Sequence, residues 1–278
     1  AQFLENLGAQ DALESRMDGR SGAGFSYFSS HPRTEERAAQ AYGIASQYPR
    51  NGMDRGREGY LKAIDGVVYG DSPGQGFVRG QSFYHPVLDF MFSVPAEFRI
   101  DNQPAQVVAV AQNGAVIILD AVANAGRLDP ATYIAQAWMR GQMVVDIERM
   151  EINGRAAATA SFPGRVNNRA VTIRLVAVAW TPDKFFRFQM AIPAGADASL
   201  IEDLKRATYS LRPMSAQEKR DVQPWKLRII TAKAGDTVES LAARTPFYDF
   251  REERFRVLNG LKSGDVVRAG HEYKLVSQ

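Results

Sequence analysis

The chemistry open to this chain is limited first by its histidines, which stand at positions 31, 85 and 271. A hydrolytic zinc site of the His-Glu-x-x-His type needs two histidines one helical turn apart, a glutamate between them as general base and a distant glutamate as third ligand. After His271 and Glu272 the chain has Leu275 where the second histidine would stand. We also expect a strand there, in which such positions are about 13 Å apart. The sequence therefore contains no complete zinc site of this type.

Other catalytic patterns are missing or incomplete. The chain has no cysteine, which excludes disulfides, zinc-thiolate sites and cysteine nucleophiles. There is no Walker loop and no Gly-x-Ser-x-Gly elbow. The glycines at 74–79 fail the dinucleotide fingerprint at its last glycine. His85 precedes an expected strand without a metal-ligand pattern, so we expect it at the surface or in a linker.

The charge and the apolar runs of the chain limit the classes of partner that we expect. The 278 residues carry 34 basic and 31 acidic side chains, a net charge of +3, without a run of lysine and arginine. Nucleic-acid binders usually gather basic charge in runs or on one face, so no nucleic-acid partner is expected. The longest apolar run, at 115–119, is far shorter than a membrane span. The first residue is Ala1 rather than methionine, and we expect the natural N-terminus to lie upstream.

Residues 83–213 are expected to form an α+β domain. Asn-Gly pairs at 113–114 and 153–154 mark hairpin turns. Asp129 is the expected cap of a helix that reaches about Arg140. Strands and a closing amphipathic helix are predicted from apolar periodicity, the strands at 88–94, 106–111, 115–122, 144–152, 156–162, 171–180 and 185–192 and the helix at 198–209. This order indicates a mainly antiparallel sheet.

Residues 1–68 are expected to be helical. Apolar spacing near the N-terminus is typical of a helix that stops at Gly8. A second helix is predicted to begin after Pro32 and to run towards Tyr48, and a short third helix covers about 57–68.

Two segments are expected to be linkers. Residues 69–82 are rich in glycine and proline, and residues 214–224 are polar. The expected organisation is a multidomain α+β chain with a helical segment, an α+β domain and a small βααβ module, at residues 1–68, 83–213 and 225–278.

The segment at 30–37 has the sequence SHPRTEER. It resembles the Ser/Thr-His-Pro…Arg loop of HtpX-like and BepA-like zinc metallopeptidases, in which the loop follows a His-Glu-x-x-His helix and a later glutamate. The resemblance implies that residues 1–68 are the helical remnant of a gluzincin catalytic domain whose zinc ligands stand before Ala1. It also implies that His31 lies beside the active-site cleft as an accessory metal ligand, and that Arg37 anchors the following helix.

Two short motifs of the middle domain have their own resemblance. They are LDFMFSVP at 88–95 and TYSLRP at 208–213. They resemble the two ends of PsbP-like α+β domains. This resemblance implies a fold and no reaction.

The C-terminal module resembles a LysM module through AKAGDTVESLA at 232–242 and FRVLNGL at 255–261. LysM modules commonly bind N-acetylglucosamine-containing glycans such as peptidoglycan, in a groove between the loop after the first strand and the loop before the last. The resemblance places four residues near this groove: Asp236, Thr237, Asn259 and Gly260. The alternative is that these four are only capping and turn residues. An insertion at 245–250 could fill or reshape the groove.

Three functions follow as hypotheses. The chain is the C-terminal part of a bacterial cell-envelope zinc metallopeptidase, which hydrolyses peptides with a zinc-activated water. Alternatively it is a non-catalytic scaffold or peptidoglycan-binding protein of the periplasm or envelope. A third hypothesis is a cleaved protease, in which this chain stays bound to its own N-terminal half. The expected cofactor is zinc in the parent enzyme, and the expected partners are that half, peptidoglycan or an envelope protein substrate.

Overall fold

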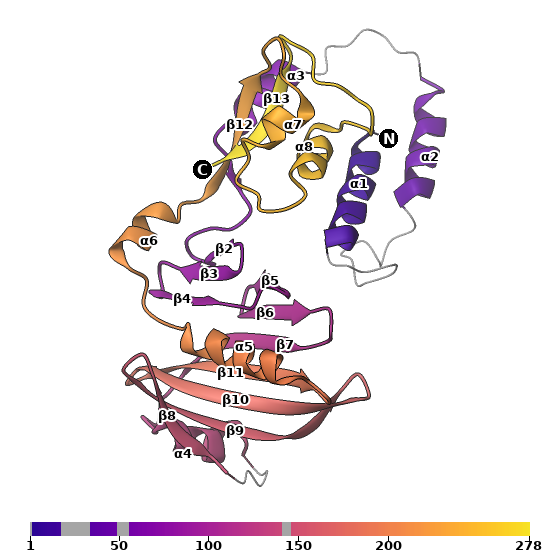
Figure 1. Ribbon diagram of the computed structural model, residues 1–278. Coiled ribbons are helices and arrows are strands. Elements are labelled where there is room, and N and C mark those ends of the chain that lie inside the picture. The colour runs from indigo at the N-terminus through magenta and orange to yellow at the C-terminus, as the bar shows by residue number, and fades with distance from the viewer. Residues whose placement is uncertain (1, 18–33, 49–55, 141–145) are drawn as a thin grey trace. The chain divides into compact units, whose positions relative to one another are not determined.

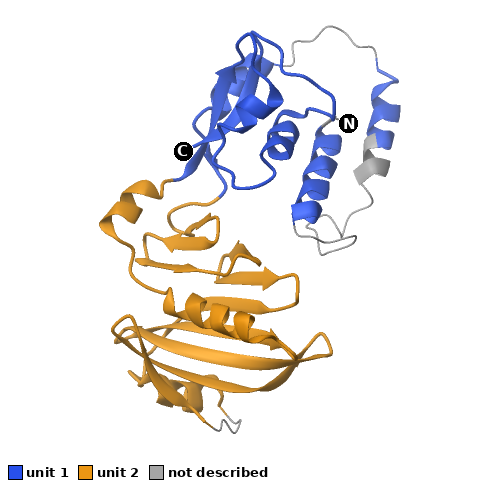
Figure 2. Cartoon of the chain, viewed as in Figure 1, with its two compact units in different colours: residues 1–70, 224–278 blue, residues 71–223 orange. Residues whose placement is uncertain are grey.

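The computed structural model describes residues 2–17, 34–48, 56–140 and 146–278 (Figure 1). The chain forms two compact units (Figure 2). Unit 2 is continuous and comprises residues 71–223, whereas unit 1 combines residues 1–70 with residues 224–278. Within the described ranges, no helix is both long and apolar enough to cross a membrane.

Unit 2 is built on a seven-stranded antiparallel sheet, as the α+β expectation requires. From one edge to the other, its strands are β5 (Phe98–Gln103), β6 (Gln106–Ala111), β7 (Val116–Ala123), β11 (Lys184–Pro193), β10 (Arg169–Thr181), β9 (Arg155–Val166) and β8 (Glu148–Ile152). The two predicted turns are confirmed: Gly114 has φ +88°, and Asn153 and Gly154 have φ +49° and +77°.

Elements pack against both faces of this sheet. On one face lie α5 (Ala198–Tyr209) and a second antiparallel sheet of β2 (Phe77–Arg79), β3 (Ser82–His85) and β4 (Phe90–Ser93). The core there includes Phe92 against Phe188, whose ring centroids are 5.9 Å apart. On the other face, α4 (Pro130–Tyr133) and the π-helix η1 (Ile134–Trp138) pack over Phe185.

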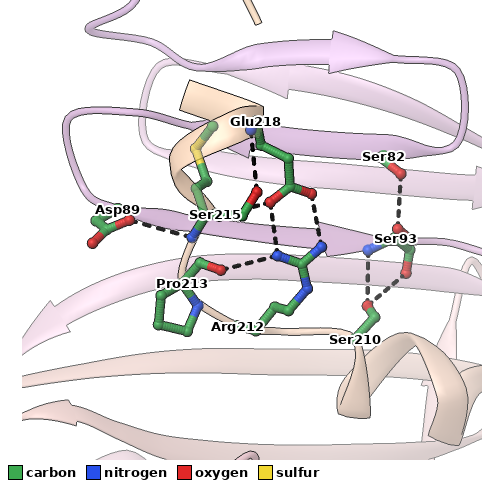
Figure 3. A network of polar contacts seen from close by, with 9 residues as sticks. Ser82, Asp89, Ser93, Ser210, Arg212, Pro213, Ser215 and Glu218 are labelled. Carbon is green, nitrogen blue, oxygen red and sulfur yellow. Dashed lines mark hydrogen bonds and ion pairs between the residues drawn. The ribbon is translucent and has the colours of Figure 1, made fainter. Parts of the chain in front are cut away.

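The C-terminal end of unit 2 is joined to β4 by a polar network around Arg212 (Figure 3). Its backbone bridges to Met91 of β4 in both directions, and its guanidinium donates two hydrogen bonds to Glu218, at 2.8 and 2.7 Å. Glu218 belongs to α6 (Ala216–Asp221), which begins with a capping box on Ser215. Residues 214–224, expected as a linker, therefore contain a capped helix fixed to β4. The polarity that suggested a linker is that of a short exposed helix.

Unit 1 contains the expected βααβ module. Its elements are β12 (Trp225–Thr231), α7 (Val238–Ala242), α8 (Arg251–Asn259) and β13 (Glu272–Ser277). Both helices cover one face of the strand pair, where Leu241, Phe255 and Leu275 are buried. The insertion at 245–250 places Phe247 against Tyr69 and Trp225, with centroid separations of 5.9 and 5.5 Å.

The N-terminal segments build onto this module. β1 (Val68–Tyr69) pairs with β12 and makes it the central strand of three. Helix α3 (Arg57–Ile64) packs against β12 and buries Leu61, and the following Asp65 accepts a hydrogen bond of 3.0 Å from the Ile229 amide. Helix α1 (Gln2–Met17) lies between α8 and α2 (Thr34–Ala45) and contacts both. The expected boundary between 1–68 and 225–278 is thus replaced by one discontinuous unit.

Several element predictions were wrong in detail. Helix α1 continues past Gly8 to Met17, because Leu13 in its second half is buried and a single glycine costs a helix only about 1 kcal/mol. The expected linker 69–82 contains β2 and the start of β3. Both strands are short and flanked by glycines, so the sequence pattern did not reveal them. Strand β5 was not predicted at all.

The helix predicted from Asp129 is partly confirmed. The Asp129 carboxylate caps it by accepting hydrogen bonds from the amides of Ala131 and Thr132, but α4 passes into η1, which ends at Trp138. The strand predicted at 144–152 begins at Glu148. A wider helical turn brings Trp138 over the guanidinium of Arg187, 4.7 Å from the ring centroid, a contact that the sequence pattern does not reveal.

Candidate functional site

The histidines do not form a metal site within the part of the chain that is described. His31 lies outside the described residues, so its expected role beside a metal stays a prediction. His271 is exposed. The described ranges contain no group of three histidine, aspartate or glutamate residues that could hold a metal ion. The peptidase resemblance places the zinc ligands before Ala1, so the zinc expected in the parent enzyme stays a prediction.

His85 is a core residue, contrary to the expectation of a surface or linker histidine. Its side chain is 8% exposed, and its ring stacks on Phe90 with centroids 5.6 Å apart. Nδ1 accepts a 3.2 Å hydrogen bond from the Leu88 amide, so Nε2 carries the proton of the neutral ring. Burial lowers the pKa of His85. The alternation of Phe83 and His85 along β3 was the signal for this inward position.

Two of the glycan candidates lie in the loop and cap that begin α7. Asp236 accepts a 2.7 Å hydrogen bond from the Lys233 amide and so closes the turn after β12. Thr237 is exposed, and its hydroxyl oxygen accepts a 3.0 Å hydrogen bond from the Ser240 amide as the helix cap. Both side chains therefore have capping or turn contacts, and the exposed cap leaves Thr237 accessible.

The other two candidates lie at the end of α8. Asn259 donates to the carbonyl oxygens of Phe255 and Lys274, at 3.0 and 2.9 Å, and accepts from the Lys274 amide at 2.7 Å. Gly260 ends the helix at φ +64°, and a Cβ there would meet the side-chain amide of Asn6 at 3.2 Å. The Asn259 amide group thus joins α8 to β13, and α1 lies against Gly260. No hydrogen bond joins either of these residues to Asp236 or Thr237 within the described residues.

A second candidate site lies in unit 2, where α5 leaves part of the sheet uncovered. We call it the Arg174 groove, a cavity of about 490 Å³. Its floor comes from β9 and β10 and its wall from α5. It is lined by Arg174, Thr159, Ser161, Thr172, Ile192, Ile201, Lys205, Glu148, Asp146 and Ala160.

Arg174 is the central charge of this groove. Its Nε donates a 3.2 Å hydrogen bond to the Thr159 hydroxyl oxygen, and that hydroxyl donates at 2.9 Å to the Leu175 carbonyl. Burial lowers the pKa of Arg174, while Tyr209, Glu148 and Glu202 act in the opposite direction. This site was not predicted from the sequence. The signal for it is the change from apolar to polar residues on one face of β10, from Val176 to Arg174.

Comparisons with known proteins identify no family for this chain. No protein-family model matches it, and neither does any curated protein. Three solved structures are similar over about half of the chain. The cyanobacterial PsbP (CyanoP) from Synechocystis sp. PCC 6803 is 12% identical with a TM-score of 0.38, covering 52% of this chain and 98% of that one. LpqN, involved in cell envelope biogenesis of Mycobacterium tuberculosis, is 14% identical with a TM-score of 0.33, covering 55% and 95%.

The third similar structure comes from Bacteroides thetaiotaomicron VPI-5482. It is 13% identical with a TM-score of 0.36, and the match covers 56% of this chain and 55% of that one. This chain therefore spans about half the length of the Bacteroides protein. At such identities and TM-scores, these likenesses carry no argument about activity, ligand or partner.

Proposed function

We propose that this chain is the C-terminal part of a cell-envelope zinc metallopeptidase and that its C-terminal module is an integral part of the peptidase body. The peptidase assignment is supported by the SHPRTEER segment at 30–37. The single observation behind the module's role is the packing inside unit 1. There, α1, α3 and β1 from the peptidase-like end contact the βααβ module.

The contacts that join the two chain ends are specific. Arg16 of α1 forms a 3.3 Å ion pair with Glu253 of α8, and Asn6 lies against Gly260. Arg57, which begins α3, donates a 2.9 Å hydrogen bond to the Glu272 carbonyl. Because α1, α3 and β1 all contact the module, we expect the module to stabilise the fold of these N-terminal elements. In this proposal, the module positions the rear of the catalytic domain instead of hanging on a flexible tether.

The test compares the full-length gene product with a version that ends before Trp225. Zinc content, casein hydrolysis and retention on peptidoglycan are measured for both. We expect a bound zinc and chelator-sensitive hydrolysis in the full protein, and loss of activity and of folded material on truncation. A full-length protein with neither zinc nor a His-Glu-x-x-His segment upstream of Ala1 would refute the peptidase assignment.

Glycan binding by the same module is the second candidate function. It is favoured by the observed strand-helix-helix-strand order and by the accessible Thr237 at the start of α7. Thr237→Val is the probe, with Thr231→Val, an exposed residue of β12, as matched control. Equal retention of both variants and of the unmodified chain on peptidoglycan would reject a role for Thr237. If the version that ends before Trp225 keeps its hydrolytic activity but is no longer retained on peptidoglycan, the module binds glycan and is not needed for the fold of the peptidase.

A further inference from the structure

The Arg174 groove interrupts an apolar surface. Along β9 and β10, the sheet face under α5 is lined by buried Ala157, Val176 and Val178. Two positions further along β9 and β10, the same face carries Thr159 and Arg174. Helix α5 buries Leu204 and Ala207 against the apolar half, while Ile201 and Lys205 border the groove. The polar half is therefore a distinct, open part of the same face.

Arg174 presents an unused half of its guanidinium to this groove. The Thr159 hydroxyl fixes Nε, whereas the two terminal nitrogens make no hydrogen bond or ion pair with any described residue. Neither Glu202 nor Glu148 satisfies them, since Glu202 pairs with Lys205 at 2.6 Å and no ion pair joins Glu148 to Arg174. A half-buried cation in this state gains more from an incoming anion than an exposed one does.

The lining of the groove selects among anions. Asp146 and Glu148 also line the groove and repel a ligand that carries several negative charges. A single carboxylate matches the planar fork of Arg174, and a backbone amide beside it can donate to Glu148. Ile192 and Ile201 offer an apolar surface in the same groove, and the volume of about 490 Å³ suits a ligand of a few residues.

We propose that the Arg174 groove binds the C-terminal carboxylate of a peptide whose last side chain is apolar. Arg174 receives the carboxylate with its terminal nitrogens, Ile192 and Ile201 contact the last side chain, and Glu148 accepts a hydrogen bond from the peptide backbone. This inference rests on unit 2 alone and stands whether or not the parent protein is a peptidase.

The test is binding of N-acetyl-alanyl-alanyl-leucine to the full chain, followed by calorimetry and by NMR shifts of β9 and β10 amides. The matching C-terminal amide is the first control ligand, and inorganic phosphate is the second. Arg174→Gln removes the proposed contact, and Arg169→Gln, an exposed arginine of the same strand outside the groove, is the matched control variant. Thermal unfolding of both variants shows that they are folded.

The expected result is binding of the free acid that weakens at least about tenfold for the amide and for Arg174→Gln, because a charge-assisted hydrogen-bond pair is lost. Arg169→Gln should bind as the unmodified chain does. Equal binding of acid and amide, unchanged binding by Arg174→Gln, or no binding of the acid at millimolar concentration would overturn the proposal. Phosphate binding as tight as that of the peptide would overturn it in favour of a general anion site.

Discussion

Unit 2 and unit 1 differ in how far apart in sequence their paired strands are. In unit 2, most neighbouring strands of the large sheet follow one another in sequence, such as β9 and β10, and are joined by tight turns. In unit 1, the central pairing of β1 with β12 joins Val68 to Lys226 from opposite ends of the chain. This pairing requires segments that are far apart in sequence to meet, whereas a hairpin forms between neighbouring segments. Unit 2 thus holds itself together locally, whereas unit 1 depends on both chain ends.

The largest predicted effect is a loss confined to unit 2. Phe188→Ala removes a fully buried ring that contacts Phe92, and we expect a loss of about 3–5 kcal/mol in the free energy of unfolding. Denaturant unfolding measures the loss, and hydrogen exchange shows whether β12 and β13 keep their protection. Phe3→Ala, at a residue that is 71% exposed, should change little. A loss of protection throughout unit 1 would show that the two units are not independent.

A smaller loss should reveal the dependence of unit 1 on its N-terminal part. Leu61→Ala in α3 removes a side chain that is 3% exposed, and we expect about 2–4 kcal/mol. The expected signature is faster hydrogen exchange in β12 and β13, far away in sequence. Tyr60→Ala, at a residue that is 56% exposed on the same helix, is the control. Unchanged exchange in β12 and β13 would mean that α3 does not stabilise the module.

The end of α8 should matter within the module itself. Asn259→Ala removes three hydrogen bonds that join α8 to its own Phe255 carbonyl and to Lys274 of β13, and we expect a loss of about 1–3 kcal/mol. Hydrogen exchange of β12 and β13 measured with increasing urea reports on this unit. Asn113→Ala, at a turn of unit 2, is a comparison that should leave the exchange of β12 and β13 unchanged. If Asn259→Ala were neutral, the contact would be replaceable by water.

The smallest effect is a pH dependence of unit 2. The hydrogen bonds from Arg212 lower the pKa of Glu218 from 4.5 to about 2. Because the folded pKa is below the unfolded one, the stabilisation is complete above about pH 5 and is lost as the pH falls from there towards 2. The pair is partly exposed to solvent, so we expect about 1 kcal/mol. The free energy of unfolding is measured between pH 7 and 2 for the unmodified chain and for Glu218→Gln, and the variant should lack this pH-dependent increment. The same pH profile in both proteins would contradict the role given to Glu218.

The sequence predicted the parts of the fold that local patterns encode. The Asn-Gly turns, the Asp129 cap and the strand-helix-helix-strand order of residues 225–278 all follow from neighbouring residues. The partners of β1 and α3 could not be predicted in this way, because their contacts lie at the other end of the chain. His85 was misplaced because strand β3, in which Phe83 and His85 alternate inward, was not predicted.

The candidate sites also differ in whether neighbouring residues or distant contacts form them. The four residues chosen by resemblance to LysM modules have identifiable cap, turn and backbone contacts, and their role in glycan binding stays a prediction. The Arg174 groove needs β8, β9, β10 and α5 to be brought together before its lining exists. Single residues such as Arg174 carry no motif that would show this in advance.

The central claim, that both chain ends build unit 1, is tested most directly by a cross-link between β1 and β12. Val68 and Lys226 face each other in this pair, and the chain has no cysteine of its own. The double variant Val68→Cys and Lys226→Cys should form a disulfide in the folded protein and not in denaturant, as mass spectrometry would show. Val68→Cys with Val266→Cys is the control, because both positions are exposed and they are not paired with each other. Failure of the first pair to cross-link in the folded chain would contradict the account.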